Sequence, residues 1–463
     1  MKRYFSLLIA VLLCSFSATY ASKALKPRIV VLTDIAPGNV EPDDMESMVR
    51  LVAYADVLEI EAIITSTGWN CDPYPDGWAD SLQRVIDAYE HDVPNLMKRS
   101  NQKGFLPVEK EEKQAMGYWP SPAYLRSRSV MGSRRSGIAV VGEGNESAGS
   151  DLIIKLADEK DPRPIWVCVW GGANTLAQAI WQVKQQRTDE ELKAFLHKLR
   201  VYTITDQDMP YAQRKNYAYS SHQWMRQEFA DDLMFLWDES AWLTQGGLGK
   251  KNWAEYASKI QGKGHLGSAY PNYKYGVEGD TPSFLYVIPN GLHDTESPSQ
   301  TGWGGCFVHG LCADSLTSAW TNWQEPQKSI SGHYEETFYN DIFNDFVARM
   351  EWAEKGKGNR NPVAIVNDKK GTEPILLKYK AGQTVKLDAS RSFDPDGHHL
   401  SYRWWVQKGI GYDGEITLLQ EDAQASFILP SDVQGQEIHI ICEVHDDGET
   451  PLVSYRRIII SSR

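Results

Sequence analysis

The segment from 28 to 52, RIVVLTDIAPGNVEPDDMESMVRLV, constrains the fold of this chain more than any other segment. Its first part, Arg28 to Leu32, is a largely apolar run, typical of a strand that is covered on both faces. A polar loop with proline and glycine follows, and apolar residues then recur at helical spacing. This strand, acidic loop and helix place Asp34, Asp43 and Asp44 at the carboxyl end of a strand, where open α/β sheets bind ligands.

These three aspartates have two interpretations. In the first, Asp43 caps the helix, Asp44 favours its dipole and Asp34 belongs to a turn. In the second, they form a site for a hard cation, because three charged carboxylates cannot lie together without a cation or shifted pKa values. The segment by itself leaves both interpretations open.

The string TDIAPGNVEPDD resembles a stretched form of the nucleoside hydrolase signature DTDPGxDDA. Leu32 stands where that signature has its first acid, and the loop from Asp34 to Asp43 is longer. More narrowly, the chain from about Lys26 to its end resembles a bacterial family of secreted cellulose-binding proteins. Members of that family pair a nucleoside-hydrolase-like domain with a C-terminal sandwich module.

The order of predicted elements divides the chain into two domains. Alternating strands and helices predict an α/β domain at 26–355, with an open, mainly parallel sheet and flanking helices. The resemblance implies that this domain is nucleoside-hydrolase-like. After a Gly/Lys/Asn linker, short strands at regular spacing predict a small all-β sandwich at 361–463. Its string LDASRSFDPDGHHLSYRWWV resembles Ig-like and cadherin-like modules, in which Trp404 or Trp405 is the buried core tryptophan. We expect this module to fold alone and to take no part in catalysis.

The resemblance implies a calcium site. Asp34, Asp44 and Asp280 would hold the ion, and the backbone carbonyl of Asn174, after a strand and two glycines, would complete the shell. Carboxylates, a carbonyl and waters are ligands that calcium accepts. The resemblance further implies that Asp34 is the catalytic general base and that Asp43 orients a sugar hydroxyl.

Asp280 has a second interpretation. It precedes a Thr-Pro step and an apolar run, so it can be an ordinary helix N-cap instead of a ligand. The nearby loop residues His293, Asp294 and Glu296 are a second candidate source of the late acid.

Other polar residues follow predicted strands and are candidates for substrate binding. Asn70 follows the strand Ile60 to Thr65, near a position where the resembled family contacts the sugar, although a turn role is equally consistent. Asp206 and Asp208 follow the strand Leu199 to Thr205, where that family lines its sugar pocket. A substrate role and a purely structural role stay open for both.

The implied chemistry is hydrolysis of an N- or O-glycosyl bond in a carbohydrate or glycoside. A carbohydrate-binding protein without catalysis and a periplasmic nucleosidase are the alternatives. The net charge of −13 argues against a nucleic acid partner. The 16 tryptophans favour a sugar ligand, since sugar rings pack on exposed aromatic side chains. A homo-oligomer is compatible with the sequence.

The first residues predict export. A basic start and an apolar run from Tyr4 to Phe16 precede small residues before Ser22, as in a secretory signal peptide at 1–21. The run is too short for a transmembrane helix, and no other apolar span is long enough to cross a membrane. We therefore expect a secreted or periplasmic protein. Cys306 and Cys312, close neighbours in a Gly-rich segment, are then the expected disulfide.

Three further segments have weaker patterns. We expect a short strand at 137–142, a helix at 225–237 and a loop with little core at 246–279.

Overall fold

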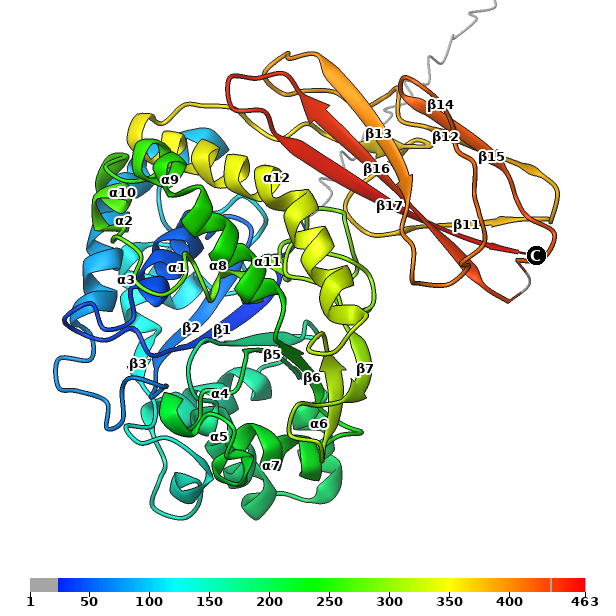
Figure 1. The fold of residues 1–463 in the computed structure, drawn as a ribbon. Helices are drawn as coiled ribbons and strands as arrows, with labels where there is room; N and C mark the ends of the chain where they lie inside the picture. Colours follow the sequence, from blue (N-terminus) through cyan, green and yellow to red (C-terminus); the bar gives the residue numbers. More distant parts are fainter. Residues whose placement is uncertain (1–23, 434, 463) are drawn as a thin grey trace, which may run out of the picture.

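A computed structural model describes residues 24–433 and 435–462. An α/β domain is followed by a β-sandwich, and the long helix α12 (Gln327–Lys355) lies between them (Figure 1). The predicted signal peptide and its cleavage site lie outside the described residues. Within the described residues, no helix combines the length and the apolar character that a membrane span requires.

An eight-stranded sheet organises the α/β domain, in the order β3-β2-β1-β4-β5-β6-β8-β7. Neighbouring strands are parallel except for the edge strand β7, which runs antiparallel to β8. The predicted fold class, an open and mainly parallel sheet with flanking helices, is therefore confirmed. The strands are β1 (Arg28–Thr33), β2 (Glu59–Thr65), β3 (Ser129–Met131), β4 (Ile165–Val169), β5 (Leu199–Ile204), β6 (Met234–Asp238), β7 (Val308–Leu311) and β8 (Ser318–Thr321).

Strand β1 lies in the middle of the sheet and is buried on both faces. Ile29 and Val31 belong to the apolar core on one face, while Val30 and Leu32 belong to the core on the other. Successive side chains of a strand point to opposite faces of the sheet. An unbroken apolar run therefore places apolar side chains in both cores.

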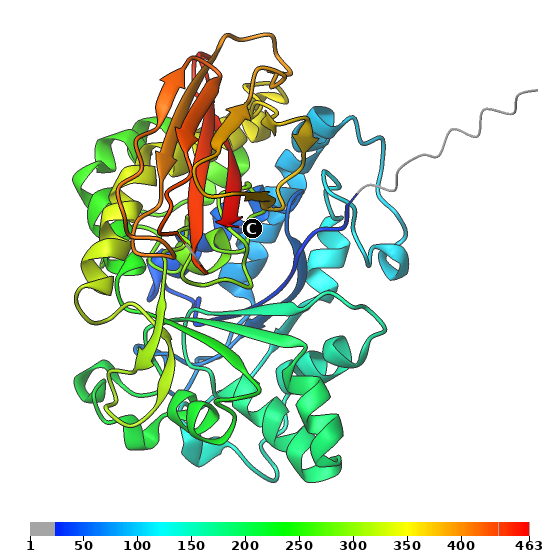
Figure 2. The same cartoon turned by 90° about the vertical axis from the view of Figure 1, so that its right-hand side faces the viewer.

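Helices cover both faces of the sheet (Figures 1 and 2). The face towards Ile29 is covered by α1 (Pro42–Ala53), α2 (Asp80–Ser100), α3 (Pro122–Ser127), α8 (Ala241–Lys251), α9 (Trp253–Lys259), α10 (Gly264–Ala269), α11 (Thr281–Leu285) and α12. The opposite face is covered by α4 (Ala148–Asp158), α5 (Asn174–Gln186), α6 (Asp189–Leu196) and α7 (Ser221–Glu228). Four short 3-10 helices lie at Val108–Lys110, Ile138–Val140, Tyr211–Gln213 and Tyr217–Tyr219.

Three predicted elements were wrong. The expected strand at 137–142 is a 3-10 helix, and the expected helix at 225–237 is α7 followed by strand β6. Strand β6 lies between β5 and β8, and a short apolar run buried on both faces cannot be told from a buried helix by periodicity. The expected loop at 246–279 contains α9 and α10, whose Tyr256 and Leu266 are buried in the core.

The C-terminal domain contains two small sheets that share one core, and a separate two-stranded sheet of β9 and β10. One sheet has the order β11-β17-β16-β13 and the other β12-β15-β14, and side chains from both meet in the core. Trp404 lies in this core, whereas Trp405 packs against the α/β domain. The strands are β9 (Ile365–Val366), β10 (Lys369–Lys370), β11 (Ile375–Tyr379), β12 (Thr384–Asp388), β13 (Leu400–Val406), β14 (Leu419–Glu421), β15 (Gln424–Ile428), β16 (Glu437–Asp446) and β17 (Val453–Ser462).

The sheet of β13, β16 and β17 packs along α12 (Figure 1). Tyr455 of β17 is part of the α/β core and donates its hydroxyl to Asp341 of α12 at 2.7 Å. Arg457 is buried and donates to the carbonyl of Leu292 at 2.7 Å. The two domains therefore meet through an apolar and hydrogen-bonded interface.

The expected disulfide was wrong, because Cys306 and Cys312 are both free and buried. Cys306 lies in the core towards α12, and Cys312 lies in the core on the opposite face of the sheet. Strand β7 separates them, so their proximity in the sequence does not bring the sulfurs together.

Candidate active site

Five carboxylates, those of Asp34, Glu41, Asp43, Asp44 and Asp280, and the amide of Asn70 converge at the carboxyl end of β1. Asp34 directly follows β1, and Asp44 lies in the first turn of α1, where it accepts a hydrogen bond from the Thr33 hydroxyl. Asp280 lies at the start of α11, far along the chain. Glu41, from the loop before α1, accepts a hydrogen bond from the side chain of Asn70.

Glycines allow the backbone to approach these acids closely. A Cβ atom at Gly68, after β2, would lie 2.0 Å from Asp34 Oδ2, and one at Gly279 would lie 2.8 Å from Asp43 Oδ2. Real Cβ atoms essentially never come so close, so a larger residue at either position would have to displace an aspartate side chain. The ends of β1 and β2 and the segment before α11 are thereby packed directly onto the acids.

The pKa values of the acids are raised by burial and by one another. Burial raises the pKa of Asp44 to about 7, with a contribution from Asp43. Burial, then Asp44 and Asp43, raise the pKa of Glu41 to about 8. For Asp280, burial and then the charges of Asp44, Asp43 and Asp34 raise the pKa well above its usual range. Asp280 also lines the same pocket as Glu41, Asp43 and Asp44, so the late acid belongs to the same cluster.

The cluster fits a hard divalent cation. Asp34 Oδ2, Asp43 Oδ1 and Asp280 Oδ2 are buried and have no hydrogen-bond partner among the described residues. One oxygen each of Glu41, Asp43 and Asp44 lies within 4.8 Å of the others, an arrangement that could hold a metal ion. Unpaired buried carboxylate oxygens are costly unless a cation compensates them.

A pocket of about 390 Å³ opens directly above these acids. Its acidic floor is formed by Glu41, Asp43, Asp44 and Asp280, and aromatic residues form much of its wall. Tyr211 is 52% exposed and meets Trp69 edge to face, with ring centroids 5.1 Å apart. Trp242 and Tyr275 line the pocket as well. An acidic floor under aromatic walls suits a ligand with hydroxyl groups and apolar ring faces.

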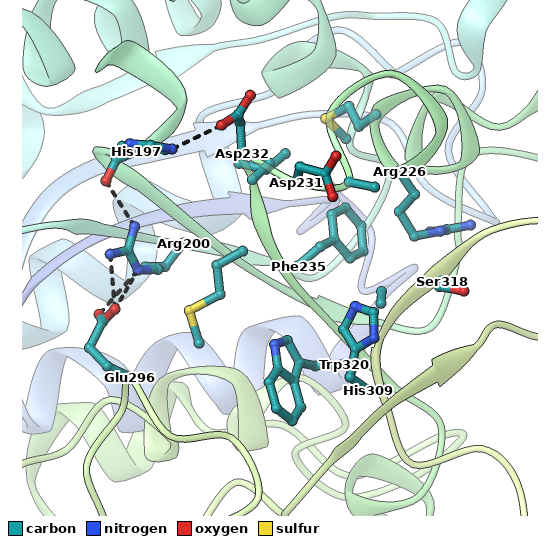
Figure 3. A pocket seen from close by; sticks show the side chains of 15 residues that line it. His197, Arg200, Arg226, Asp231, Asp232, Phe235, Glu296, His309, Ser318 and Trp320 are labelled. Atoms are coloured by element: carbon teal, nitrogen blue, oxygen red, sulfur yellow. Dashed lines mark hydrogen bonds and ion pairs between the residues drawn. The ribbon is translucent and has the colours of Figure 1, made fainter. Parts of the chain in front are cut away.

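Another pocket, of about 450 Å³, lies at the other end of the strands, away from the acids (Figure 3). Its walls include the amino ends of β5, β6 and β8. Several of its charged side chains are already paired: Arg200 with Glu296, His197 with Asp232, and Arg226 with Asp314. The carboxyl ends of the strands therefore offer the better candidate active site.

Two family profiles match the chain. The profile described as "Cellulose-binding Sde182, nucleoside hydrolase-like domain" matches residues 28–307. The profile described as "Cellulose-binding protein Sde0182, C-terminal domain" matches residues 384–462. The chain belongs to the Sde182 family.

A solved relative supports this assignment over nearly the whole length. It is a nucleoside hydrolase-related hypothetical protein from Saccharophagus degradans, described as associated with carbohydrate metabolism. It is 34% identical, the match covers 95% of this chain and 100% of that one, and the TM-score is 0.78. The predicted family resemblance is thus confirmed, and the acid cluster lies in a nucleoside hydrolase-like domain.

Two other solved structures share little with the chain. A chimeric titin Z1Z2 with a decorin peptide is 13% identical over 23% of this chain and 100% of that chain, with a TM-score of 0.15. The endo-fucoidan hydrolase MfFcnA4 of glycoside hydrolase family 107 is 10% identical over 95% of this chain and 68% of that chain, with a TM-score of 0.18. At these TM-scores neither likeness carries an argument. No protein of curated function matches the chain.

The structure brings together most of the predicted site residues of this Sde182 family member. Asp43, Asp44, Asp280 and Asn70 line the pocket. Asp34 belongs to the same acid cluster but is not among the residues that line the pocket, because it is buried beneath Gly68.

Three predicted site residues lie elsewhere. Asp206 and Asp208 are buried away from the pocket, and their oxygens accept hydrogen bonds from protein groups, including the Ser220 hydroxyl and the Ala173 amide. Asn174 starts α5 and donates its side-chain amide to the carbonyl of Arg135. The second candidate source of the late acid, the loop with His293, Asp294 and Glu296, does not line the pocket either.

Sequence reasoning missed Glu41 and the aromatic wall. Glu41 lies in the loop string VEPDD, directly before the two aspartates, and this proximity is a signal that could have identified it. Tyr211 starts a short 3-10 helix and Tyr275 lies in a loop, both far along the chain from the acidic segment, and local sequence carries no signal that they would meet there.

Proposed function

We propose that this protein is a calcium-dependent hydrolase that cleaves an N- or O-glycosyl bond of a carbohydrate or glycoside. The observation that carries the proposal is the convergence, beneath an aromatic pocket, of carboxylate oxygens from Asp34, Asp43 and Asp280 that have no hydrogen-bond partner within residues 24–433 and 435–462. The nucleoside hydrolase-like domain and the relative associated with carbohydrate metabolism support this reaction class.

In this proposal Asp34, Asp44 and Asp280 hold the cation, with Asp43 beside them. When bound, the cation would supply positive charge that keeps these carboxylates ionised and attracts sugar hydroxyls. No described contact links the Asn174 carbonyl to the cluster, so we leave it out of this ligand set.

The pocket-facing residues would handle the substrate. Glu41 and Asp43 line the pocket, so their oxygens can accept hydrogen bonds from sugar hydroxyls or a proton from an attacking water. Trp69 and Tyr211 would stack on a sugar ring, and Asn70 would hold Glu41 in place. Asp34, the base expected from the family resemblance, would need an opening beside Gly68 to reach that water.

A carbohydrate-binding protein without catalysis is the second candidate. Burial of Asp34 away from the pocket and the family description as cellulose-binding favour it. The two candidates share the sugar-binding pocket and differ only in turnover.

The experiment combines calcium calorimetry with a panel of glycosides, nucleosides and cello-oligosaccharides. Wild type should bind calcium and turn over at least one member of the panel. Asp44→Asn keeps the side-chain shape and should lower calcium affinity at least about tenfold and abolish turnover, because a charged ligand is lost. Asp80→Asn, an exposed acid in the first turn of α2, is the matched control and should change neither quantity.

The substrate side is tested by two further comparisons. Tyr211→Ala should weaken carbohydrate binding about tenfold and leave calcium affinity unchanged, because stacking is lost but the acids remain. Comparing the turnover rates of Glu41→Gln and Asp34→Asn identifies which of these two carboxylates accepts the proton. Equal calcium binding by wild type and Asp44→Asn would refute the metal assignment, and sugar binding without turnover would favour the binding protein.

We also propose that the protein is secreted or periplasmic, because the first 21 residues have the pattern of a signal peptide. Amino-terminal sequencing of the exported protein should then start near Ser22. Recovery of the intact chain, starting at Met1, from the cytoplasm would contradict this.

A further inference from the structure

A second buried polar cluster lies behind the wall of the pocket. It consists of Asp206 and Asp208, directly after β5, and His222 in the first turn of α7, all three buried. His222 Nε2 lies 3.8 Å from Asp206 Oδ1 and 3.6 Å from Asp208 Oδ1. Both distances are too long for hydrogen bonds.

The imidazole of His222 makes no hydrogen bond within the described part of the chain. Neither ring nitrogen has a hydrogen-bond partner among the described residues, and the side chain is fully buried. The neighbouring Ser221 hydroxyl also lacks a partner within the described part of the chain. Burying unpaired polar atoms costs free energy, so these residues need a ligand that the protein groups do not supply.

The two carboxylates are held rigidly in place. Asp208 accepts hydrogen bonds from the Ala173 amide at 2.8 Å and from the Ser221 amide. Asp206 accepts a hydrogen bond from the Ser220 hydroxyl and a longer one, at 3.3 Å, from the Asp208 amide. Outer hydrogen bonds of this kind orient the carboxylate ligands of metal ions in proteins.

We propose that Asp206, Asp208 and His222 form a second metal site, for a divalent transition ion of the zinc class. In tetrahedral coordination at zinc bond lengths, ligand atoms lie roughly 3.3–3.6 Å apart, close to the spacings found here. All three donor atoms lie within 4.8 Å of one another. One imidazole nitrogen with two carboxylates suits a transition ion, whereas calcium prefers oxygen ligands alone.

The position of this site indicates a positioning role. Gln207 stands between the two aspartates and lines the substrate pocket together with Thr205, which precedes them. Gln207 also donates a hydrogen bond to the carbonyl of Trp170 at the end of β4. An ion that ties residues 206 and 208 to α7 fixes this part of the pocket wall without touching the substrate.

The test uses the full mature protein, stripped with a chelator and titrated with Co²⁺, with calcium in excess. Wild type should bind one Co²⁺ per chain with the visible absorption bands of a four-coordinate site. His222→Gln should weaken this binding at least about 100-fold, because a direct ligand is lost. Asp44→Asn should keep the bands, since it alters only the acid cluster.

Retained bands in folded His222→Gln would overturn the proposal, as would bands lost in Asp44→Asn alone. Asp206→Asn, which keeps the side-chain shape, is the second variant if His222→Gln does not fold. X-ray absorption of wild type with one equivalent of zinc needs no variant: one imidazole ligand is expected, and none would refute the site. Calcium binding at the acid cluster is measured separately, so either site can fail without the other.

Discussion

Asp44 shows how the surroundings of one residue decide its chemistry. In the first turn of an exposed helix, an aspartate mainly favours the helix dipole. Here the side chain is buried, accepts a hydrogen bond from Thr33 and lies beside other carboxylates. Its pKa is raised to about 7. Near neutral pH, a proton and a cation therefore compete for this carboxylate.

The raised pKa values predict a pH-dependent effect of calcium. Glu41, Asp44 and Asp43 have pKa values of about 8, 7 and 6, above the usual range of carboxyl groups. The folded protein without cation therefore binds more protons than the unfolded chain, and these acids lower the free energy of unfolding as pH rises to about 8. Bound calcium compensates the negative charge of the ionised acids. At high pH it also competes with fewer protons for their oxygens.

Scanning calorimetry should therefore show a larger increase in Tm on adding calcium at pH 8 than at pH 6. Asp44→Asn should reduce the increase at both pH values. An increase that is the same at both pH values in wild type would contradict the assignment of these acids as ligands.

At the scale of elements, α1 anchors the segment that delivers Asp280. Arg50 Nη1 lies 2.6 Å from Glu278 Oε2, and both side chains are buried. Glu46, one turn earlier on α1, accepts a hydrogen bond from the backbone amide of Glu278 at 2.6 Å. The helix that carries Asp44 thus also holds the residues immediately before Asp280.

Arg50→Met tests this anchor. Removing Arg50 leaves the buried Glu278 carboxylate without its cationic partner, so the free energy of unfolding should fall by about 3–5 kcal/mol in urea titrations. Calcium affinity should fall as well, because Asp280 loses its support. Arg126→Met, which breaks exposed pairs with Asp87 and Glu90, is the control and should cost less than about 1 kcal/mol. Equal losses in both variants would refute the anchoring role.

At the scale of the whole molecule, the sandwich completes the core of the α/β domain. Ile441, Val453 and Tyr455 belong to the same apolar cluster as the residues of α12. Trp303 donates to the Tyr455 hydroxyl at 3.3 Å, and Tyr334 stacks on Trp405. An α/β domain without the sandwich would expose this surface to water, so residues 22–358 should keep the acid cluster but melt at a lower temperature.

Tyr455→Ala measures the coupling without a truncation. Removing a buried aromatic side chain should lower the free energy of unfolding by about 3–5 kcal/mol, with one cooperative transition for both domains. Leu376→Ala, at a sandwich position that is 67% exposed, should stay within about 0.5 kcal/mol. Two separate transitions in wild type would show that the domains unfold independently.

Local patterns in the sequence were sufficient for the central strand, the acidic loop and the helix that follows. The apolar run of β1 predicts burial on both faces, and the order of elements predicts a mainly parallel sheet followed by a sandwich. Asp43 and Asp44 could be named as candidates for a site because they lie in the same loop and first turn, and the segment by itself leaves a structural role open. These features depend on residues close together in the chain, where spacing alone carries the information.

Only the tertiary structure decided which distant residues join that loop. The resemblance names Asp280 as a candidate, but its place beside the acids, next to the close approach of Gly279 to Asp43, comes from the fold. Asp206 and Asp208 instead lie beside His222. Strand β6 formed where a helix was expected, because its place between β5 and β8 buries both of its faces. The physical reason is the same in each case: burial and close approach depend on partners supplied by the fold, which local spacing does not specify.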